Sequence, residues 1–397
     1  MLDQDLIAKL TKPAQVEPDS GIVNVAMYGF GRPDLVAFWS GEGNLPTPEA
    51  FCKPVGESLA KGETYYTWQR GIPELREALA RYHTRHFGRP FSFENFCVTG
   101  GGMQAIQIAI QMLAADGDEI IIPSPAWPNY AGPLRIQGTV PVEVPMLFKE
   151  KRWSLDLDRL FAAAGPKTKA ICINSPSNPI GWCASREDLI AIRDFARRKG
   201  LWIIADEVYS LFYFGADGAA RAPSFLDVCD TEEQLVLCNT FSKNWAMTGW
   251  RQGWIQVPKA LAPVAERLIQ FNTSGSPVFL QRGCTAALEL GDSFVAQQVA
   301  TARRNRDIVT EALRPLNRIH FQVPDGAFYF FFAVEGMKDS LTTARRLVDE
   351  ANVGFAPGAA FGAAGEGFLR MCYLKDEDKL LEGISRFKGW LASHEPS

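Results

Sequence analysis

The chain has 397 residues, of which 22% are charged and 47% hydrophobic, and its formal net charge is −4. This composition is typical of a globular protein of two or three domains, and the slight excess of acidic residues argues against nucleic acid as a partner. The first residues lack the basic and apolar regions of a signal peptide, and no apolar run is long enough to cross a bilayer. We therefore expect a cytoplasmic protein without a membrane partner.

The cysteine and histidine spacings favour neither a disulfide framework nor a metal site. The eight cysteines show no CxxC spacing, and several lie in apolar runs such as residues 169–173. This pattern is typical of buried thiols in a reducing compartment, although sequence alone leaves a disulfide open. The four histidines are not spaced with cysteines or acids as metal ligands are. His83 and His86 share one face of a predicted helix, which we expect to be solvated.

The N-terminal region shows one candidate ligand-binding turn and one clear helix. Residues 1–45 are irregular in pattern and end in a turn-rich segment at residues 38–48. Gly41 in that segment would let the backbone approach a ligand closely, and a plain turn glycine explains it equally well. A helix is expected from residue 72 to residue 82, because Pro73 suits a first helical turn and apolar residues recur at helical spacing.

A strand, a glycine turn and a helix follow one another in residues 95–114. The strand covers residues 95–99, three glycines follow, and a helix with an apolar face begins at Met103. Such a turn directs free backbone N–H groups at one point and suits a phosphate, with a purely structural turn as the alternative. The glycines match neither GxGxxG nor the P-loop, which disfavours a dinucleotide or ATP site.

Further apolar strands alternate with helical patterns. These strands are expected at residues 119–123, 140–144, 169–174, 201–205 and 234–238. The alternation predicts a mainly parallel sheet covered by helices on both faces. Polar motifs follow the last three strands and contain Asn178, then Asp206 with Tyr209, then Thr240 with Lys243. We therefore expect these side chains to meet at the carboxyl edge of the sheet, where ligand sites collect.

The side chains at this edge suit a charged aromatic ligand. Asp206 follows an apolar run, and a buried carboxylate needs a cation such as a pyridinium nitrogen. Lys243 stands among uncharged residues and can form a Schiff base, while Arg251 can hold an anion. Tyr209 and Asn178 supply donors for a phenolate oxygen, and Trp127 supplies a flat face for a ring. Together these residues complete the set of groups that pyridoxal phosphate requires. Taken singly, each residue also has a structural explanation in a turn, a sheet edge or the core.

The pattern changes beyond about residue 290. A long polar helix at residues 300–313 is followed by short strands at residues 319–323, 324–332 and 368–373 and by a helix at residues 342–352. Mixed elements of this kind predict a smaller α+β domain, with which the N-terminal segment is expected to pack. The expected division is a large domain at residues 46–289 and a small domain formed by residues 1–45 and 290–397.

The order and spacing of these motifs resemble those of the class I/II aminotransferases, in the fold type I family of pyridoxal-phosphate-dependent enzymes, over essentially the whole chain. The resemblance implies an α/β fold with a seven-stranded, mainly parallel sheet between helices, a smaller α+β domain, and pyridoxal 5'-phosphate as cofactor. It implies that Lys243 is the Schiff-base lysine and the general acid and base, and that Asp206 pairs with the ring nitrogen. Asn178 and Tyr209 would bind the ring oxygen, and Trp127 would stack on the ring.

The same resemblance implies how the phosphate, the substrate and a second subunit are bound. The phosphate cup would consist of the backbone of Gly101, Gly102 and Met103 with the side chains of Thr240 and Arg251. Tyr66 resembles the tyrosine that reaches the phosphate of the neighbouring subunit, which implies a homodimer with shared sites. Arg370 resembles the arginine that takes the substrate α-carboxylate in a planar fork, assisted by Gly41 and Asn178. The motif at residues 178–181 has Ile180 where the family usually has threonine, which affects only the local turn.

The resemblance implies an aminotransferase that moves the amino group of an L-amino acid to a 2-oxo acid. A carbon–sulfur β-lyase that uses pyridoxal phosphate is the alternative, because it shares the whole apparatus and fold does not settle reaction type. A ligand-binding domain of a transcription regulator is a remote third possibility, since the chain leaves no room for a DNA-binding domain before residue 38.

The amino donor is less sharply defined by the sequence. A second carboxylate on the substrate would need another cation, for which Arg32 and Arg70 are candidates, although both are expected to be surface charges. A neutral, apolar or aromatic donor is favoured by aromatic residues in stretches that border the substrate in this family, and core packing explains them nearly as well. These residues are Tyr28, Phe30, Phe38, Trp39 and Trp68.

Overall fold

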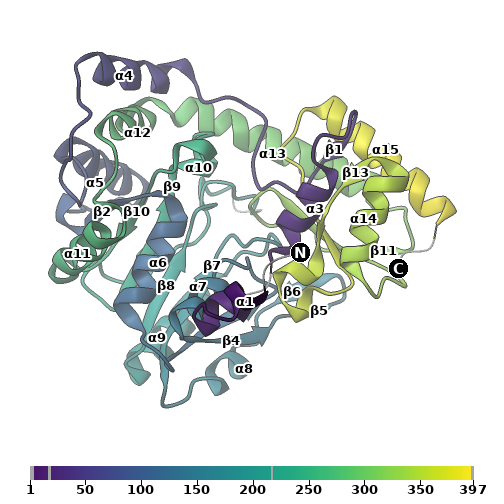
Figure 1. Ribbon diagram of the computed structural model, residues 1–397, viewed down its shortest axis with the longest axis horizontal. Helices are drawn as coiled ribbons and strands as arrows, with labels where there is room; N and C mark the ends of the chain where they lie inside the picture. Colours follow the sequence, from purple (N-terminus) through teal and green to yellow (C-terminus); the bar gives the residue numbers. More distant parts are fainter. Residues whose placement is uncertain (1–3, 17–18, 216–217, 395–397) are drawn as a thin grey trace.

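The computed structural model of the protein describes residues 4–16, 19–215 and 218–394. A seven-stranded sheet forms the larger half (Figure 1), in the order β2-β10-β9-β8-β7-β3-β4. The neighbouring pairs from β9 to β4 are parallel, and β10 is antiparallel to both of its neighbours. The strands are β2 (Phe96–Thr99), β3 (Glu119–Ser124), β4 (Val140–Pro145), β7 (Thr168–Asn174), β8 (Trp202–Asp206), β9 (Leu235–Thr240) and β10 (Gly253–Gln256). The predicted mainly parallel sheet is confirmed.

The seventh strand, β10, has no counterpart in the sequence analysis. It has only four residues, begins with Gly253 and is buried throughout, so it offers neither the length nor the alternation that marks a strand. Its antiparallel direction also breaks the strand–helix alternation on which the other strands were recognised. The segment after Lys243 thus turns back and enters the sheet between β2 and β9.

Helices cover both faces of the sheet, as predicted. Alternate residues of β7 point to opposite faces. Ala170 packs in a core with α6 (Gly101–Leu113) and α11 (Ala262–Thr273). Ile171 belongs to a second core that includes residues of α9 (Arg186–Lys199). Because both sides of the strand are apolar, β7 reads as a continuous hydrophobic run.

The helix α5 (Pro73–Phe87) begins where expected and continues one turn further than residue 82. The expectation that His83 lies on a solvated face is wrong, because its side chain is 2% exposed. Its ring packs 4.7 Å from that of Phe96 on β2, between centroids. Burial lowers the pKa of His83 to about 3, so the imidazole is a neutral core residue at physiological pH.

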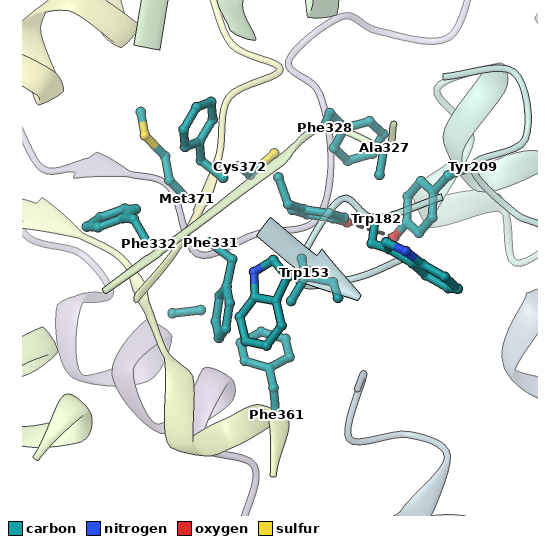
Figure 2. Close-up of a cluster of buried hydrophobic side chains, with 14 of the residues drawn as sticks. Trp153, Trp182, Tyr209, Ala327, Phe328, Phe331, Phe332, Phe361, Met371 and Cys372 are labelled. Carbon is teal, nitrogen blue, oxygen red and sulfur yellow. Dashed lines mark hydrogen bonds between the residues drawn. The ribbon is translucent and has the colours of Figure 1, made fainter. Parts of the chain in front are cut away.

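The smaller half is built on a four-stranded antiparallel sheet, in the order β11-β12-β15-β14. Its strands are β11 (Ile319–Phe321), β12 (Tyr329–Val334), β14 (Ala356–Pro357) and β15 (Phe368–Cys372), with α14 (Ser340–Ala351) and α15 (Glu377–Ser393) beside them. The helix α13 (Asp292–Leu313) runs between the two halves in Figure 1 and starts earlier than the predicted residue 300. Figure 2 shows part of the aromatic core, where Trp153 and Phe361 lie against Phe331 of β12.

The N-terminal segment packs with the smaller half, as expected, but is more regular than its sequence pattern indicates. It contains α3 (Gly21–Gly29), which begins at the capping residue Ser20. The short strand β1 (Val36–Ala37) pairs in parallel with β13 (Val353–Gly354). The exact division of the chain at residues 45 and 290 stays a prediction.

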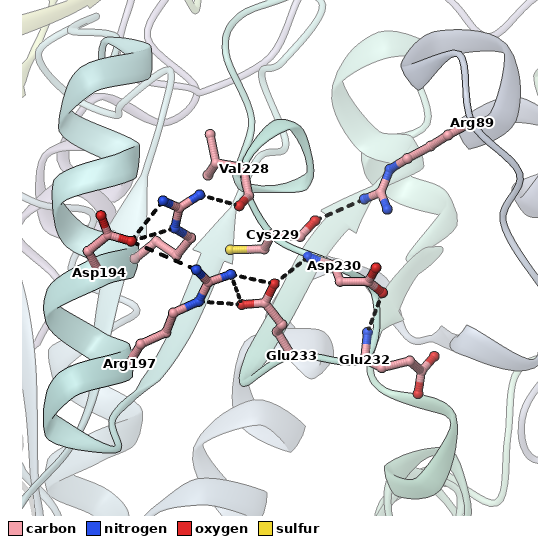
Figure 3. Close-up of polar contacts among 9 residues, drawn as sticks. Arg89, Asp194, Arg197, Val228, Cys229, Asp230, Glu232 and Glu233 are labelled. Carbon is pink, nitrogen blue, oxygen red and sulfur yellow. Dashed lines mark hydrogen bonds and ion pairs between the residues drawn. The ribbon is translucent and has the colours of Figure 1, made fainter.

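The opposite end of the large sheet is held by a polar network (Figure 3). Arg197 on α9 bonds Glu233 at 2.6 Å, just before β9 begins, and Arg193 donates to the backbone oxygen of Val228. Arg89 donates to the backbone oxygen of Cys229. These contacts tie a loop to a helix at the amino end of β9, far along the strand from the predicted site.

Two further expectations concern the whole chain. The eight cysteines are free thiols, and only Cys52 is exposed. Within the described ranges, we find no helix with the length and apolar character needed to span a bilayer.

Candidate active site

A pocket of about 510 Å³ lies where β7, β8 and β9 end. Half of its lining residues were named from the sequence: these are Trp39, Gly41, Gly102, Met103, Trp127, Asn178, Asp206, Tyr209, Thr240, Lys243, Arg251 and Arg370. The parallel register explains the meeting of the strand ends, because Asn174 is paired with Asp206 and Asp206 with Cys238. Side chains distant in sequence are thereby brought to one cavity.

Lys243 follows β9 directly, on the short helix α10 (Phe241–Asn244). Its Nζ donates to the backbone oxygen of Gly41 at 2.8 Å and lies 5.9 Å from the ring centroid of Tyr209. Burial is the main cause that lowers the pKa of Lys243 to about 8. A substantial fraction of this amine is therefore neutral near physiological pH, as a nucleophile or a base must be.

Asp206 ends β8 and is 2% exposed. Its carboxylate accepts a short hydrogen bond from the Tyr130 hydroxyl and one of 3.2 Å from the Val208 backbone N–H. Burial raises the pKa of Asp206 to about 6, against the opposing effect of these donors. A cation bound next to this carboxylate would recover the energy lost on its burial.

A cradle suited to an anion lies at the start of α6. Gly101 has φ +83°, and a Cβ there would stand 2.6 Å from Nη2 of Arg251. Arg251 itself adopts a left-handed backbone with φ +53° and donates to the backbone oxygen of Thr248. The side chain of Thr240 accepts from the Ser242 backbone N–H at 3.1 Å. Free N–H groups at a helix start and an adjacent guanidinium are what a phosphate requires.

Arg370 forms the opposite wall, on β15, and is 2% exposed. One Nη donates to Oδ1 of Asn178 at 3.0 Å, and the other makes a short bond to the backbone oxygen of Trp39. Its Nε is buried without a hydrogen-bond partner in the described part of the chain. A buried cation is costly without an anion, and a carboxylate bound in the pocket that Arg370 lines would offset this cost.

The sequence analysis missed Tyr130 and Tyr329, both of which line the pocket. Tyr130 lies one helical turn after Trp127, close enough in sequence for the Trp-Pro-Asn-Tyr run to have signalled it. Tyr329 stands in a run of apolar and aromatic residues that carries only a core signal. Its hydroxyl pairs with that of Tyr209 at 2.7 Å.

Several other sequence candidates lie outside the pocket. Tyr66 is 92% exposed and borders a separate cavity with residues 273–279. Arg32 pairs with Asp349 at 2.6 Å, and Arg70 pairs with Glu266 at 2.7 Å. Of the five aromatic candidates, only Trp39 lines the pocket. Phe38 is buried in the core, and the exposed ones are Tyr28, Phe30 and Trp68.

The sheet order, the glycine cradle and the buried lysine at the strand ends define a fold type I pyridoxal-phosphate-dependent enzyme. Residues 36–387 match the family model described as "Aminotransferase class I and II", and the chain belongs to this family. Members of the family use pyridoxal phosphate. The protein is accordingly an aminotransferase.

Similar proteins cover nearly the whole chain. A "Probable aspartate/prephenate aminotransferase" of Aquifex aeolicus is 35% identical over 361 residues, which are 89% of this chain and 90% of that protein. "Aromatic-amino-acid aminotransferase 2" of Thermococcus litoralis is 33% identical and covers 98% and 96%. The crystal structure of an aspartate aminotransferase from Thermotoga maritima matches with a TM-score of 0.89 at 32% identity, over 97% of this chain and 100% of that one.

Proposed function

We propose that the protein binds pyridoxal phosphate in this pocket and moves the amino group of an L-amino acid to a 2-oxo acid. The observation that carries the proposal is the meeting of Lys243, Asp206 and Arg370 around one cavity of about 510 Å³. An amine with a lowered pKa, a buried carboxylate and a guanidinium with an unused donor have no shared structural purpose there. Together they match the needs of a cationic, phosphorylated ring and an amino acid.

The residues present fit this cofactor. Asp206 would face the ring nitrogen, Asn178 and Tyr209 the ring oxygen, and Trp127 the ring face. The phosphate would be held by the backbone of Gly101, Gly102 and Met103 with Thr240 and Arg251. The fit is supported by Gly101, whose φ of +83° favours glycine and where a Cβ would stand 2.6 Å from Nη2 of Arg251.

In the proposed reaction, bound pyridoxal phosphate supplies an electron sink for the electrons left on the substrate Cα. The neutral Nζ of Lys243 would take the α-proton from the substrate as a general base and would later give it up as a general acid. The Asp206 carboxylate would stabilise a positive charge on the ring nitrogen. Arg370, which lines the pocket, would bind the α-carboxylate with its planar guanidinium and so fix the Cα relative to Lys243.

We also propose a homodimer in which Tyr66 reaches the partner's site, in the cytoplasm. The support is a run of exposed aromatic side chains at this position in the chain, since Tyr65, Tyr66 and Trp68 are 85%, 92% and 59% exposed. Large exposed aromatic side chains that gather in one area are typical of an interface. Sedimentation of the purified protein tests the dimer, and Tyr66→Phe should weaken binding of pyridoxal phosphate only if that hydroxyl reaches a phosphate.

For the donor, we propose a neutral, apolar or aromatic amino acid. The pocket lining holds three cations, Lys243, Arg251 and Arg370, and each already has a role. Ile22, Val23 and Ala26 of α3 add an apolar surface to the same pocket. A panel of amino donors with 2-oxoglutarate and pyruvate as acceptors tests this, and a preference for aspartate would contradict it.

The decisive experiment replaces Lys243 with alanine. We expect Lys243→Ala to develop no protein-linked visible absorbance with pyridoxal phosphate and to lose transaminase activity by about 10³-fold or more. Lys259→Ala is the matched control, because Lys259 pairs with Glu94 at the surface. Normal turnover of Lys243→Ala would overturn the proposal.

A second measurement separates the transaminase from the β-lyase. The wild-type enzyme is mixed with an amino acid and no oxo acid. A transaminase releases one equivalent of oxo acid for each site and then stops, because the amino group stays on the cofactor. Continued release of pyruvate and ammonia would identify the lyase instead.

A further inference from the structure

Tyr329 is a buried pocket residue that the proposed mechanism does not use. It begins β12 and is 0% exposed to solvent, yet it lines the cavity beside Lys243 and Arg370. Its backbone is paired with Cys372 of β15, two residues beyond Arg370, so the sheet fixes the position of one relative to the other.

Three contacts place Tyr329 between groups with separate roles. Its hydroxyl pairs with that of Tyr209 at 2.7 Å. The guanidinium carbon of Arg370 stands 4.6 Å from the centroid of its ring. A Cβ added to Gly41 would come within 2.5 Å of its hydroxyl oxygen. Since the Gly41 oxygen accepts from Lys243, Tyr329 contacts two pocket residues directly and lies beside the backbone that holds the amine of a third.

We propose that Tyr329 is a positioning residue, whose hydroxyl orients Tyr209 toward the cofactor ring and whose ring face fixes Arg370 for the substrate carboxylate. The inference rests on the proposed function. Phenylalanine at this position removes the hydroxyl alone, and the difference between phenylalanine and leucine reports on the ring.

The hydroxyl task follows from hydrogen-bond geometry. Tyr209 is 4% exposed, and a buried phenol hydroxyl needs hydrogen-bond partners both as a donor and as an acceptor. The Tyr329 hydroxyl occupies one of these directions, which leaves the other for a ligand oxygen in the pocket. Without Tyr329, the Tyr209 hydroxyl has no fixed orientation and aligns a ring oxygen less well.

The ring task follows from the surroundings of Arg370. Its guanidinium lies between two aromatic rings, 4.6 Å from the centroid of Tyr329 and 5.0 Å from that of Phe361. A cation is attracted to the face of an aromatic ring, and the attraction grows when water is excluded. Phenylalanine at position 329 would keep this contact, and leucine would lose it.

The experiment compares Tyr329→Phe, Tyr329→Leu and the control Tyr373→Phe in the enzyme loaded with pyridoxal phosphate. Tyr373 is also fully buried in the smaller half, and its hydroxyl donates to the Ala327 backbone oxygen outside the pocket. The measurements are kcat, KM for the amino donor, the visible circular dichroism of the bound cofactor, and the affinity for hexanoate, a carboxylate without an amino group.

We expect Tyr329→Phe to lower kcat about tenfold and to change the visible circular dichroism, with KM and hexanoate affinity within about twofold of wild type. Tyr329→Leu should in addition raise KM and weaken hexanoate binding, each about tenfold. Tyr373→Phe should leave all four measurements within about twofold.

The outcomes separate this inference from the proposed function. A wild-type protein that binds no pyridoxal phosphate contradicts the proposed function itself. If the wild type turns over and Tyr329→Phe behaves like Tyr373→Phe, the orienting hydroxyl is refuted. If hexanoate affinity is equal in Tyr329→Phe and Tyr329→Leu, the role of the ring is refuted.

Discussion

The two walls of the pocket are built in different ways. On the wall formed by the large sheet, Asn178, Asp206 and Lys243 follow the ends of parallel strands, and backbone register alone brings them together. On the opposite wall, Arg370 and Tyr329 come from paired antiparallel strands, and the guanidinium of one lies over the ring of the other. The first wall carries the groups proposed for bond chemistry, and the second carries those proposed for substrate binding. Removal of a charged group from the first wall should therefore lower kcat, and removal of the Arg370 guanidinium from the second should raise KM.

The largest effect is expected for Asp206→Asn on the large-sheet wall. Asparagine keeps the shape, and its single side-chain oxygen can still accept one of the bonds that Tyr130 and Val208 donate to the two carboxylate oxygens, but it cannot balance a positive ring nitrogen. Loss of a preorganised charge that acts in the transition state lowers kcat about 10³-fold, with little change in KM. Steady-state kinetics over a range of donor concentrations checks this. A rise in KM alone would place Asp206 among the substrate-binding groups.

The opposite pattern is expected for Arg370→Leu. Leucine removes the guanidinium that binds the carboxylate, and truncation of one partner of a buried charge pair costs several kcal/mol. We expect kcat/KM to fall about 10²-fold, mainly through KM, and hexanoate binding to weaken in parallel. Arg370→Lys is the informative companion, because lysine retains the charge without the planar fork. Full recovery by lysine would contradict a bidentate contact.

Glu207 is next to Asp206 in sequence but belongs to neither wall, so its substitution should affect stability and not the pocket. Its carboxylate accepts from the Phe225 backbone N–H at 3.0 Å, and burial raises its pKa to about 7. The folded protein thus holds a proton that the unfolded chain releases above its ordinary pKa of 4.5. This contribution to stability is fully present below pH 4.5 and is lost as the pH rises through 7.

Glu207→Gln is neutral at every pH and removes this dependence. The free energy of unfolding of the variant, relative to wild type, should rise by roughly 3 kcal/mol across that interval. Urea denaturation at a series of pH values measures the difference. A constant difference would mean that Glu207 titrates normally.

The smallest effect is expected at the amino end of the large sheet, in the network of Figure 3. Arg197 and Glu233 form a close pair, but the Arg197 side chain is 50% exposed. Exposed ion pairs contribute little, so Arg197→Ala should lower the free energy of unfolding by less than about 1 kcal/mol and leave kcat and KM unchanged. Thermal denaturation and steady-state kinetics check both. A change in kcat would mean that the two ends of the sheet are coupled.

The difference between the walls also explains which residues the sequence could predict. A parallel strand followed by a polar motif places a side chain at a known edge, which is why Asp206 and Lys243 were found without a structure. Tyr329 lies within the run Ala-Phe-Tyr-Phe-Phe-Phe, where nothing distinguishes a pocket residue from a core residue. For His83 the prediction of a solvated face was wrong, because its neighbours in sequence are charged although its ring packs against Phe96 in the core. Contacts between distant antiparallel elements leave no periodic signal.

The order of these parts along the chain has a consequence for biosynthesis. Once residue 256 has left the ribosome, the growing polypeptide possesses all seven strands of the large sheet, the glycine cradle and Lys243. Tyr329 and Arg370 emerge only later. A ligand captured by the first part would stabilise a nascent half-site before the rest is translated, because binding to a folded form draws the equilibrium toward it. The supply of cofactor during translation would then influence the yield of mature protein.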